Sequence, residues 1–307
     1  MQAERELREQ LRNIDHKSYP LYKSLKGSYR FTKYILHIDH VQGDPFAAPS
    51  DVRIVVDAKA AGFPEFARKD SLTKEALADV LLREFEKQIH QFTFKARGSG
   101  KSGLISISHP GQEVLRHTAC EVGTKEITMR FSIGFPANGR TINAKELDKI
   151  LFDYLPVCVE RALYYQNLDA KSVRAAIDLA EDQQAIRGQL QEMGLVAFVA
   201  NGSVLPRESG ISFHPMKGAK EFVSPESLEV TMELPHKGTI RGMGIRKGIT
   251  LIVGGGYHGK STILTALELG VYNHIAGDGR EYVIADETAV KLRSEDGRFI
   301  KNVDISM

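Results

Sequence analysis

Residues 254–262 constrain the fold of this chain more than any other segment. They read Gly-Gly-Gly-Tyr-His-Gly-Lys-Ser-Thr and satisfy the phosphate-loop pattern G-x-x-x-x-G-K-[S/T]. The preceding run, 249–253, is apolar and β-branched, and the following run, 262–269, has a helical pattern. The motif therefore lies in a strand–loop–helix context, which predicts an α/β domain with a phosphate-binding loop (P-loop).

The residue types of this loop suit a nucleotide. Glycines allow main-chain N–H groups to surround a phosphate, and the helix beginning near Lys260 directs its positive end toward it. Lys260 is predicted to neutralise the β- and γ-phosphates as the catalytic residue, and the Ser261 hydroxyl to bind a bridging Mg²⁺. The predicted nucleotide-binding residues are Gly254, Gly255, Gly256, Tyr257, His258, Gly259, Lys260, Ser261 and Thr262. The alternative is a glycine-rich turn with an incidental lysine.

Composition sets wider limits. At 307 residues, 42% hydrophobic and 26% charged, the chain is long enough for two hydrophobic cores. No apolar run reaches the roughly 18 residues of a membrane span, and residues 1–12 are too charged for a secretory signal. Cys120 and Cys158 lack metal-site spacing, so we expect reduced, buried thiols and a cytoplasmic or organelle-matrix protein. The net charge of +2 means that any nucleic-acid surface has to be local.

Strand and helix patterns alternate in the N-terminal part of the chain. Strands are predicted over residues 29–40, 52–58, 104–108, 113–119 and 126–135. Helices are predicted over residues 4–14, 73–91, 144–151, 157–166 and 172–193. Together these patterns predict an α+β domain with a mixed sheet.

A second loop, residues 95–103, imitates the phosphate loop but fails its pattern. The position five before Gly100 is Lys95 rather than glycine, and a strand pattern follows. Its glycines and basic side chains could still approach phosphates of a nucleotide or a nucleic acid. The candidate contacts are Lys95, Arg97, Gly98, Ser99, Gly100, Lys101 and Ser102. The alternative is a flexible basic loop.

Residues 206–225 are rich in proline and glycine and have little periodicity, which predicts a linker. We therefore expect an N-terminal α+β domain over 1–205, a linker over 206–225, and the beginning of an α/β nucleotide-binding domain over 226–307. Strand patterns at 228–234 and 238–245 precede the P-loop strand. Antiparallel strands in that position resemble the opening of an ATP-binding-cassette domain.

The resemblance becomes specific when further segments are considered together. Residues 242–245, 254–262, 270–275 and 277–282 resemble the predicted ABC-class ATPase family, which are cassette proteins unattached to membrane spans. Residues 40–47, 97–103 and 110–115 resemble the N-terminal domain of that family. The resemblance implies binding of ATP and Mg²⁺, a homodimer, and RNA as a candidate partner, because a member of the family is an accessory ATPase of mitochondrial RNA editing.

The resemblance also implies parts that this sequence does not contain. Members of the family continue into a signature segment, a magnesium-aspartate strand and a switch histidine, so we expect this chain to correspond to the N-terminal half. Residues 283–287 end in Asp286 and Glu287 and could imitate the missing carboxylate pair, but residues 289–300 resemble a hairpin around Asp296 and Gly297. We expect this chain alone to bind nucleotide weakly and to hydrolyse it negligibly.

Three functional classes remain open at this stage. The first is an ATPase that acts on nucleic acid through Lys95, Arg97 and Lys101. The second is a P-loop phosphotransferase that uses Asp286, which requires Asp286 to lie beside Lys260. The third is a nucleotide-gated interaction module without catalysis.

Overall fold

The computed structural model describes residues 1–294, 297–302 and 304. The chain divides into two compact units, which are described separately. Unit 1 comprises Met1–Pro110 and Arg116–Ile177, and unit 2 comprises Gly111–Leu115 and Asp178–Met307. An α+β domain with a mixed sheet is therefore followed by a P-loop domain, which confirms the predicted fold class.

A twisted sheet forms the framework of unit 1, with strand order β1-β2-β3-β4-β8-β5 and with β7 also paired to β8. Its strands are β1 (Gln2–Ala3), β2 (Gly27–Arg30), β3 (Ile35–His40), β4 (Ser50–Asp57), β5 (Ile105–Ser106), β7 (Cys120–Val122) and β8 (Glu126–Ile133). The β1–β2 pair is parallel and the other pairs are antiparallel. A small separate pair joins β9 (Ala137–Asn138) to β10 (Thr141–Ile142).

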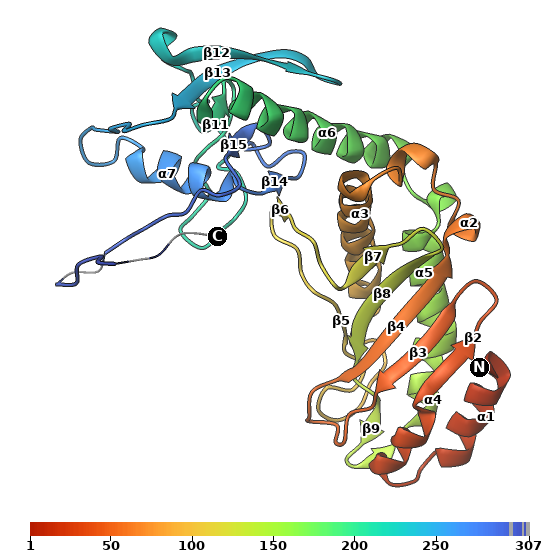
Figure 1. Cartoon of the computed structure of the whole chain (residues 1–307). Coiled ribbons are helices and arrows are strands. Elements are labelled where there is room, and N and C mark those ends of the chain that lie inside the picture. The colour runs from red at the N-terminus through yellow and green to blue at the C-terminus, as the bar shows by residue number, and fades with distance from the viewer. Residues whose placement is uncertain (295–296, 303, 305–307) are drawn as a thin grey trace. The chain divides into compact units, whose positions relative to one another are not determined.

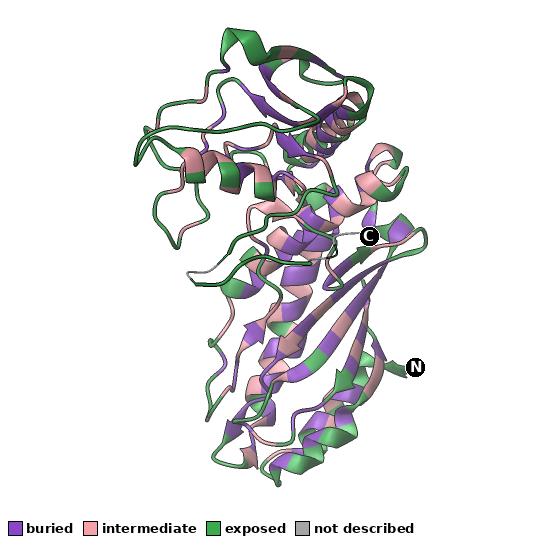
Figure 2. Cartoon of the chain, turned by 60° about the vertical axis from the view of Figure 1, so that its left-hand side comes forward, coloured by how far each residue is buried: buried purple, intermediate pink, exposed green. Residues whose placement is uncertain are grey.

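Helices complete unit 1. They are α1 (Glu4–Ile14), η1 (Tyr19–Leu25), α2 (Ala58–Ala61), η2 (Glu65–Ala67), α3 (Ser71–His90), α4 (Ala144–Asp148), η3 (Lys149–Tyr154), α5 (Leu155–Leu163), η4 (Tyr165–Asn167) and the start of α6 (Ala170–Glu192). Helices α3 and α5 lie behind the sheet (Figure 1), where Leu77, Leu81 and Phe85 of α3 are fully buried. Figure 2 shows buried residues concentrated along these strands and helices. Every second side chain of a strand points to the same face of the sheet, and the apolar faces of the helices cover these side chains and form the core.

Unit 2 is built on a sheet with strand order β12-β13-β11-β15. The strands are β11 (Leu195–Ala200), β12 (Glu229–Leu234), β13 (Gly238–Arg246) and β15 (Val283–Ala285), all paired antiparallel. The 3₁₀ helix η5 (Glu226–Leu228) precedes β12, and a short pair joins β6 (Glu113–Val114) to β14 (Asn273–His274). Helix α7 (Lys260–Leu269) follows the phosphate loop.

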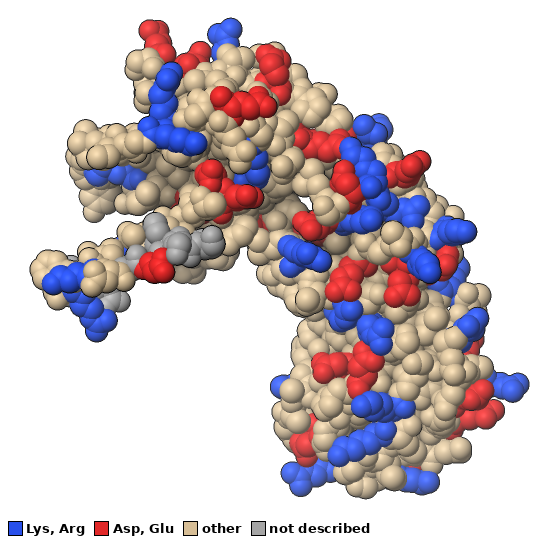
Figure 3. All heavy atoms as spheres, in the orientation of Figure 1, with Lys and Arg blue, Asp and Glu red and all other residues tan. Residues whose placement is uncertain are grey.

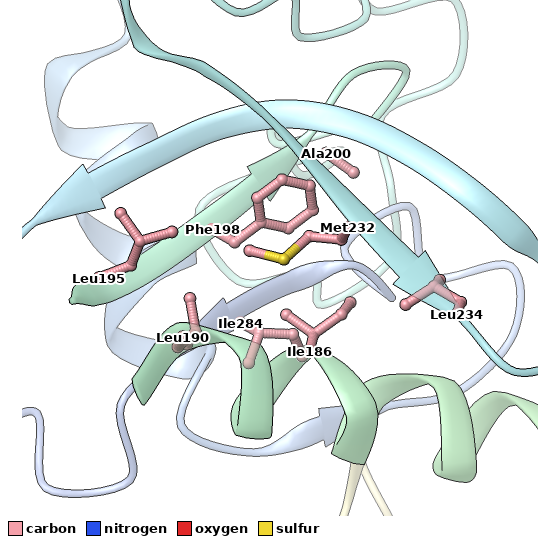
Figure 4. Packing of buried hydrophobic residues seen from close by; sticks show 8 residues of the cluster. All are labelled: Ile186, Leu190, Leu195, Phe198, Ala200, Met232, Leu234 and Ile284. Atoms are coloured by element: carbon pink, nitrogen blue, oxygen red, sulfur yellow. The ribbon is translucent and has the colours of Figure 1, made fainter. Parts of the chain in front are cut away.

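The core of unit 2 lies between this sheet and α6. Its buried members are Ile186, Leu190, Leu195, Phe198, Ala200, Met232, Leu234 and Ile284, which Figure 4 shows pointing toward one another from the helix and the strands. Phe198 is 0% exposed and is the largest side chain of this cluster. A second cluster on the other side joins Val199 and Val283 to Ala266 of α7. The phosphate-loop helix is therefore anchored to the sheet by its buried face.

The boundary between the units differs from the one that the sequence predicts. The main part of unit 2 begins at Asp178, within α6, instead of at residue 226. The residues of strand β11 fall within the N-terminal domain expected over 1–205, but the strand pairs with both β13 and β15 of unit 2. Segment 206–225, expected to be a linker, packs within unit 2, since the Phe222 N–H donates to Ser203 and the Gly202 N–H donates to Phe222. Low periodicity therefore marks an irregular segment here and not a boundary.

Two further expectations concern the chain as a whole. In the part of the chain that the structure describes, no helix has the length and apolar character needed to cross a membrane. The hairpin expected around Asp296 and Gly297 includes Asp296, which lies outside the described residues.

Candidate functional site

The phosphate loop ends in a helix whose first turn is open. Gly259 caps α7 with φ +82°, a left-handed conformation that favours glycine, and no side chain of the described residues caps the helix. Among the described residues, the N–H groups of Lys260, Ser261 and Thr262 have no acceptor, and the first bond at this end runs from the Ile263 N–H to Gly259. Unpaired N–H groups and the positive end of the helix together form a binding position for an anion.

Lys260 lies folded over the loop. Its Nζ donates to the carbonyl oxygens of Gly254 at 2.8 Å and Gly255 at 2.5 Å. No carboxylate forms an ion pair with Lys260 among the residues that the structure describes, so its charge is available to a phosphate. Ser261 is exposed at the start of α7, and Tyr257 has φ +62° with its side chain fully in solvent.

The run before the loop is not a strand in the structure. Residues 249–253 are irregular, and Ile249, Leu251 and Val253 are strongly exposed. The expectation of a strand here was wrong for the described residues, because no described strand offers its backbone to pair with this run. A β-branched sequence favours a strand only where a partner satisfies its N–H and C=O groups.

The opposite end of α7 is held by α6. Arg187 donates to the carbonyl oxygens of Ala285 at 2.8 Å and Gly270 at 3.4 Å, and to Asn273 Oδ1 at 3.1 Å. Burial lowers the pKa of Arg187, and the nearby carboxylates of Glu287 and Asp286 oppose that shift. The arginine thus joins the end of the P-loop helix to the end of β15.

A buried charged cluster lies in the segment after α7, and sequence reasoning missed it. Asp278 Oδ2 accepts from Arg207 at 2.9 Å and lies 2.7 Å from Nδ1 of His274, whose Nε2 faces the carbonyl of Leu269 at 3.2 Å. Both histidine nitrogens therefore face acceptors. Burial alone raises the pKa of Asp278, but the hydrogen bonds from His274 and Arg207 outweigh it and hold that pKa below its usual range.

Arg280 completes this cluster. It is 2% exposed, its Nε donates to the carbonyl of Leu205 at 3.0 Å, and burial lowers its pKa to about 10. One feature of the sequence could have revealed the cluster. Segment 277–282 contains charged residues and is one of the segments that carry the family resemblance. Its acidic and basic side chains fix residues 203–207 against the segment behind α7.

Comparison with known proteins identifies the family of the chain. A family described as "ATPase of the ABC class N-terminal" matches residues 4–166, more than half of the chain, and an ABC ATPase "P-loop domain" matches residues 169–307. This chain belongs to the ABC-class ATPases. The uncharacterized protein MJ1628 of Methanocaldococcus jannaschii is 35% identical to it over 140 residues, which cover 41% of this chain and 31% of that protein.

In this ABC-class ATPase the second glycine-rich loop is tightly packed. Ser102 is buried, its hydroxyl donates to the Ser99 carbonyl at 2.5 Å, and it accepts from the Ala137 N–H at 3.0 Å. The Ser99 N–H donates to Ala137, the Lys101 N–H to Pro45, and the Gly103 N–H to Gly134. Most main-chain donors of residues 95–103 are therefore already used, so the loop is not a phosphate cradle like the first one. Lys95 and Arg97 remain exposed.

Asp286 of this ABC-class ATPase lies away from the phosphate loop. Its carboxylate accepts from the N–H and hydroxyl of Thr288, and these hydrogen bonds lower its pKa. The residue before it, Ala285, donates its N–H to Gly270 at the far end of α7. Ten residues of helix separate the two ends of α7 by about 15 Å. The structure therefore does not bring Asp286 to Lys260.

Proposed function

We propose that this chain binds ATP and Mg²⁺ at residues 254–262 and that the whole protein hydrolyses ATP. The observation that carries the proposal is the open first turn of α7 beside Lys260, whose ammonium group bonds to loop carbonyls and pairs with no carboxylate of the described residues. The family match supports the same proposal, since it identifies a P-loop ATPase domain.

Each residue of the loop has a separate task in this proposal. The N–H groups of Lys260, Ser261 and Thr262 bind phosphate oxygens, and Lys260 exchanges the carbonyls of Gly254 and Gly255 for the β- and γ-phosphates. Ser261 provides a hydroxyl to Mg²⁺, which neutralises the phosphate charge. Hydrolysis further needs a carboxylate that orients water. Asp286 does not reach the loop, so we expect the chain by itself to bind ATP with negligible turnover.

Calorimetry of ATP with Mg²⁺ tests this proposal, with Lys260→Ala and a matched control, Lys247→Ala. Lys247 is an exposed lysine that precedes the loop, and its backbone N–H donates to the carbonyl of Gly194. Loss of charge-assisted bonds worth about 1.5–3 kcal/mol lowers ATP affinity roughly 10- to 150-fold in Lys260→Ala, while Lys247→Ala retains it. A folded wild-type chain that does not bind ATP, or equal binding by both variants, contradicts the proposal.

A second proposal is that the ATPase acts on RNA through Lys95, Arg97 and Lys101. The exposed side chains of Lys95 and Arg97 form no ion pair with a described carboxylate, and Lys95 stands 4.7 Å from the ring of Phe92. Figure 3 shows basic and acidic side chains interspersed on the visible face, so a nucleic-acid surface has to be as local as this one. The family resemblance supports RNA as the partner.

Salt dependence distinguishes this proposal from a nucleotide-gated interaction module. Binding of a single-stranded RNA should weaken with salt, with a slope of about −0.7 for each phosphate neutralised. The triple variant K95A/R97A/K101A should reduce the slope by about 2 in the same titration. A flat salt response contradicts RNA binding. Sedimentation that shows dimerisation changing with ATP, without consumption of ATP, supports the module instead.

A further inference from the structure

Two carboxylates of α6 lie on the same face of the helix. Asp178 and Glu181 are three residues apart, a spacing that places side chains next to one another. Their side chains are 27% and 18% exposed, respectively, so both are partly removed from water and partly accessible to it. This pair provides oxygen donors on a rigid element.

The turn between β12 and β13 brings a histidine to these carboxylates. Residues 235–237 connect the strands, and Gly238 closes the turn with φ +77°. The buried carboxylate of Asp182 accepts from the N–H of His236 at 2.9 Å and of Lys237 at 3.1 Å. Figure 1 shows the β12–β13 hairpin running alongside α6. The position of the histidine is therefore fixed by its own backbone.

The three side chains lie close together, with the imidazole ring between the two carboxylates. Nε2 of His236 lies 2.6 Å from Glu181 Oε2, and its Nδ1 lies 3.6 Å from Asp178 Oδ1. One donor atom from each of the three residues lies within 4.8 Å of the others. A tetrahedral ion bound at about 2.1 Å requires donor separations of about 3.4 Å, so small side-chain rotations on a fixed backbone are sufficient.

The chemistry of the donors indicates which ion fits. Two carboxylates and one imidazole form a mixed oxygen and nitrogen set, which suits zinc and neighbouring transition metals, whereas Mg²⁺ and Ca²⁺ prefer oxygen alone. A divalent ion also balances the two carboxylates beside a neutral imidazole. The exposed side of the cluster leaves room for a water ligand and a path of entry.

We propose that Asp178, Glu181 and His236 bind a divalent transition-metal ion, for which zinc is the best match, and that this ion fastens the β12–β13 hairpin to α6. The site is separate from Ser261 and from the Mg²⁺ that accompanies ATP. The proposal therefore does not depend on nucleotide binding.

Zinc titration of the full chain, stripped with EDTA and free of nucleotide, tests the proposal by calorimetry. We expect one zinc ion per chain, and affinity at least about 10- to 100-fold weaker in His236→Ala and in Glu181→Gln. His214→Ala is the matched control, because His214 is an exposed histidine of the same unit outside the cluster. Cys120 and Cys158 are buried, so thiolates do not compete in the folded chain.

Two readouts separate a metal site from a purely electrostatic clamp. Co²⁺ in place of zinc should give visible absorption bands of a four- or five-coordinate ion without thiolate charge transfer. Zinc should also slow amide exchange at His236 and Lys237, whose N–H groups bond to Asp182, in the wild type and in His214→Ala only. The charge-neutral Glu181→Gln keeps the test valid if His236→Ala does not fold. Absence of zinc binding, or binding that persists in both cluster variants, overturns the proposal.

Discussion

Replacement of Gly103 by alanine measures how rigidly the second glycine-rich loop is packed. Gly103 has φ +78°, and a Cβ atom there would lie 1.9 Å from the carbonyl oxygen of Ala96 and 2.9 Å from its carbon. Its N–H donates to Gly134 at 2.9 Å and its carbonyl accepts from Phe94 at 2.7 Å. The backbone is thus held on both sides and cannot move away without breaking a hydrogen bond.

The matched control is Gly139→Ala. Gly139 has φ +61°, but no atom of the described residues lies within 4 Å of its hypothetical Cβ, so this variant measures the cost of the left-handed backbone alone. A left-handed alanine costs about 1–2 kcal/mol, partly offset by the stiffer unfolded chain, which gives about 1 kcal/mol for the control. Steric overlap adds about 1–3 kcal/mol at Gly103, for a total of about 3 kcal/mol.

Calorimetric unfolding of the full chain provides the assay. For a unit of this size about 1 kcal/mol corresponds to about 2–4 °C, so Gly103→Ala should unfold unit 1 about 4–8 °C below Gly139→Ala. Amide exchange at Gly103 and Phe94 should accelerate in the same variant. Equal midpoints for the two variants refute the reasoning, because they show that residues 95–103 adapt freely and form the flexible basic loop of the alternative interpretation.

Three other predictions concern unit 2. Phe198→Ala should lower the free energy of unfolding by about 3–5 kcal/mol in urea titration, since the ring is fully buried; a loss below about 1 kcal/mol contradicts the packing of Figure 4. Arg187→Leu should destabilise unit 2 by about 2–4 kcal/mol, because the carbonyls of Ala285 and Gly270 lose their donor, and calorimetry should leave the transition of unit 1 unchanged. The folded-state pKa of Asp278 is lowered, so its contribution is complete above about pH 4 and disappears as the pH falls through the folded-state pKa. Asp278→Asn should therefore be less stable at neutral pH and lose less stability on acidification, and parallel pH profiles would contradict this assignment.

Local signals in the sequence predicted local structure well. Helix α7 begins at Lys260, directly after a left-handed glycine, because the loop pattern specifies its own backbone conformation. Helix α3 extends over Ser71–His90, close to the predicted 73–91, because its apolar residues recur at helical spacing. The strand expected at 249–253 depends instead on a partner far away in the sequence, which no local pattern reveals.

The buried charges behind α7 show a different limit. Asp278 and Arg280 are 0% and 2% exposed, although charged residues in a glycine-rich segment are typical of a solvated turn. Burial is possible here because Asp278 pairs with Arg207 and His274, and because Arg280 donates to the carbonyl of Leu205. His274 is only four residues from Asp278, but Arg207 and Leu205 come from a distant segment, which the sequence alone does not bring together with Asp278 and Arg280.

The polar face of α6 explains why unit 2 begins inside a helix. Gln189 donates from Nε2 to the carbonyl of Glu233 at 2.7 Å and accepts from the Glu233 N–H at 3.0 Å. Strand β12 lies at the edge of its sheet, so this side-chain amide bonds to main-chain groups that a neighbouring strand would otherwise pair with. Gln183 donates likewise to the carbonyls of His274 and Glu281, both at 2.9 Å. The amide residues of this helix face suggest exposure to solvent in the sequence, but they form hydrogen bonds to the main chain of unit 2. The C-terminal part of α6 is therefore a structural part of the P-loop domain, although it precedes every strand of the β12-β13-β11-β15 sheet in the sequence.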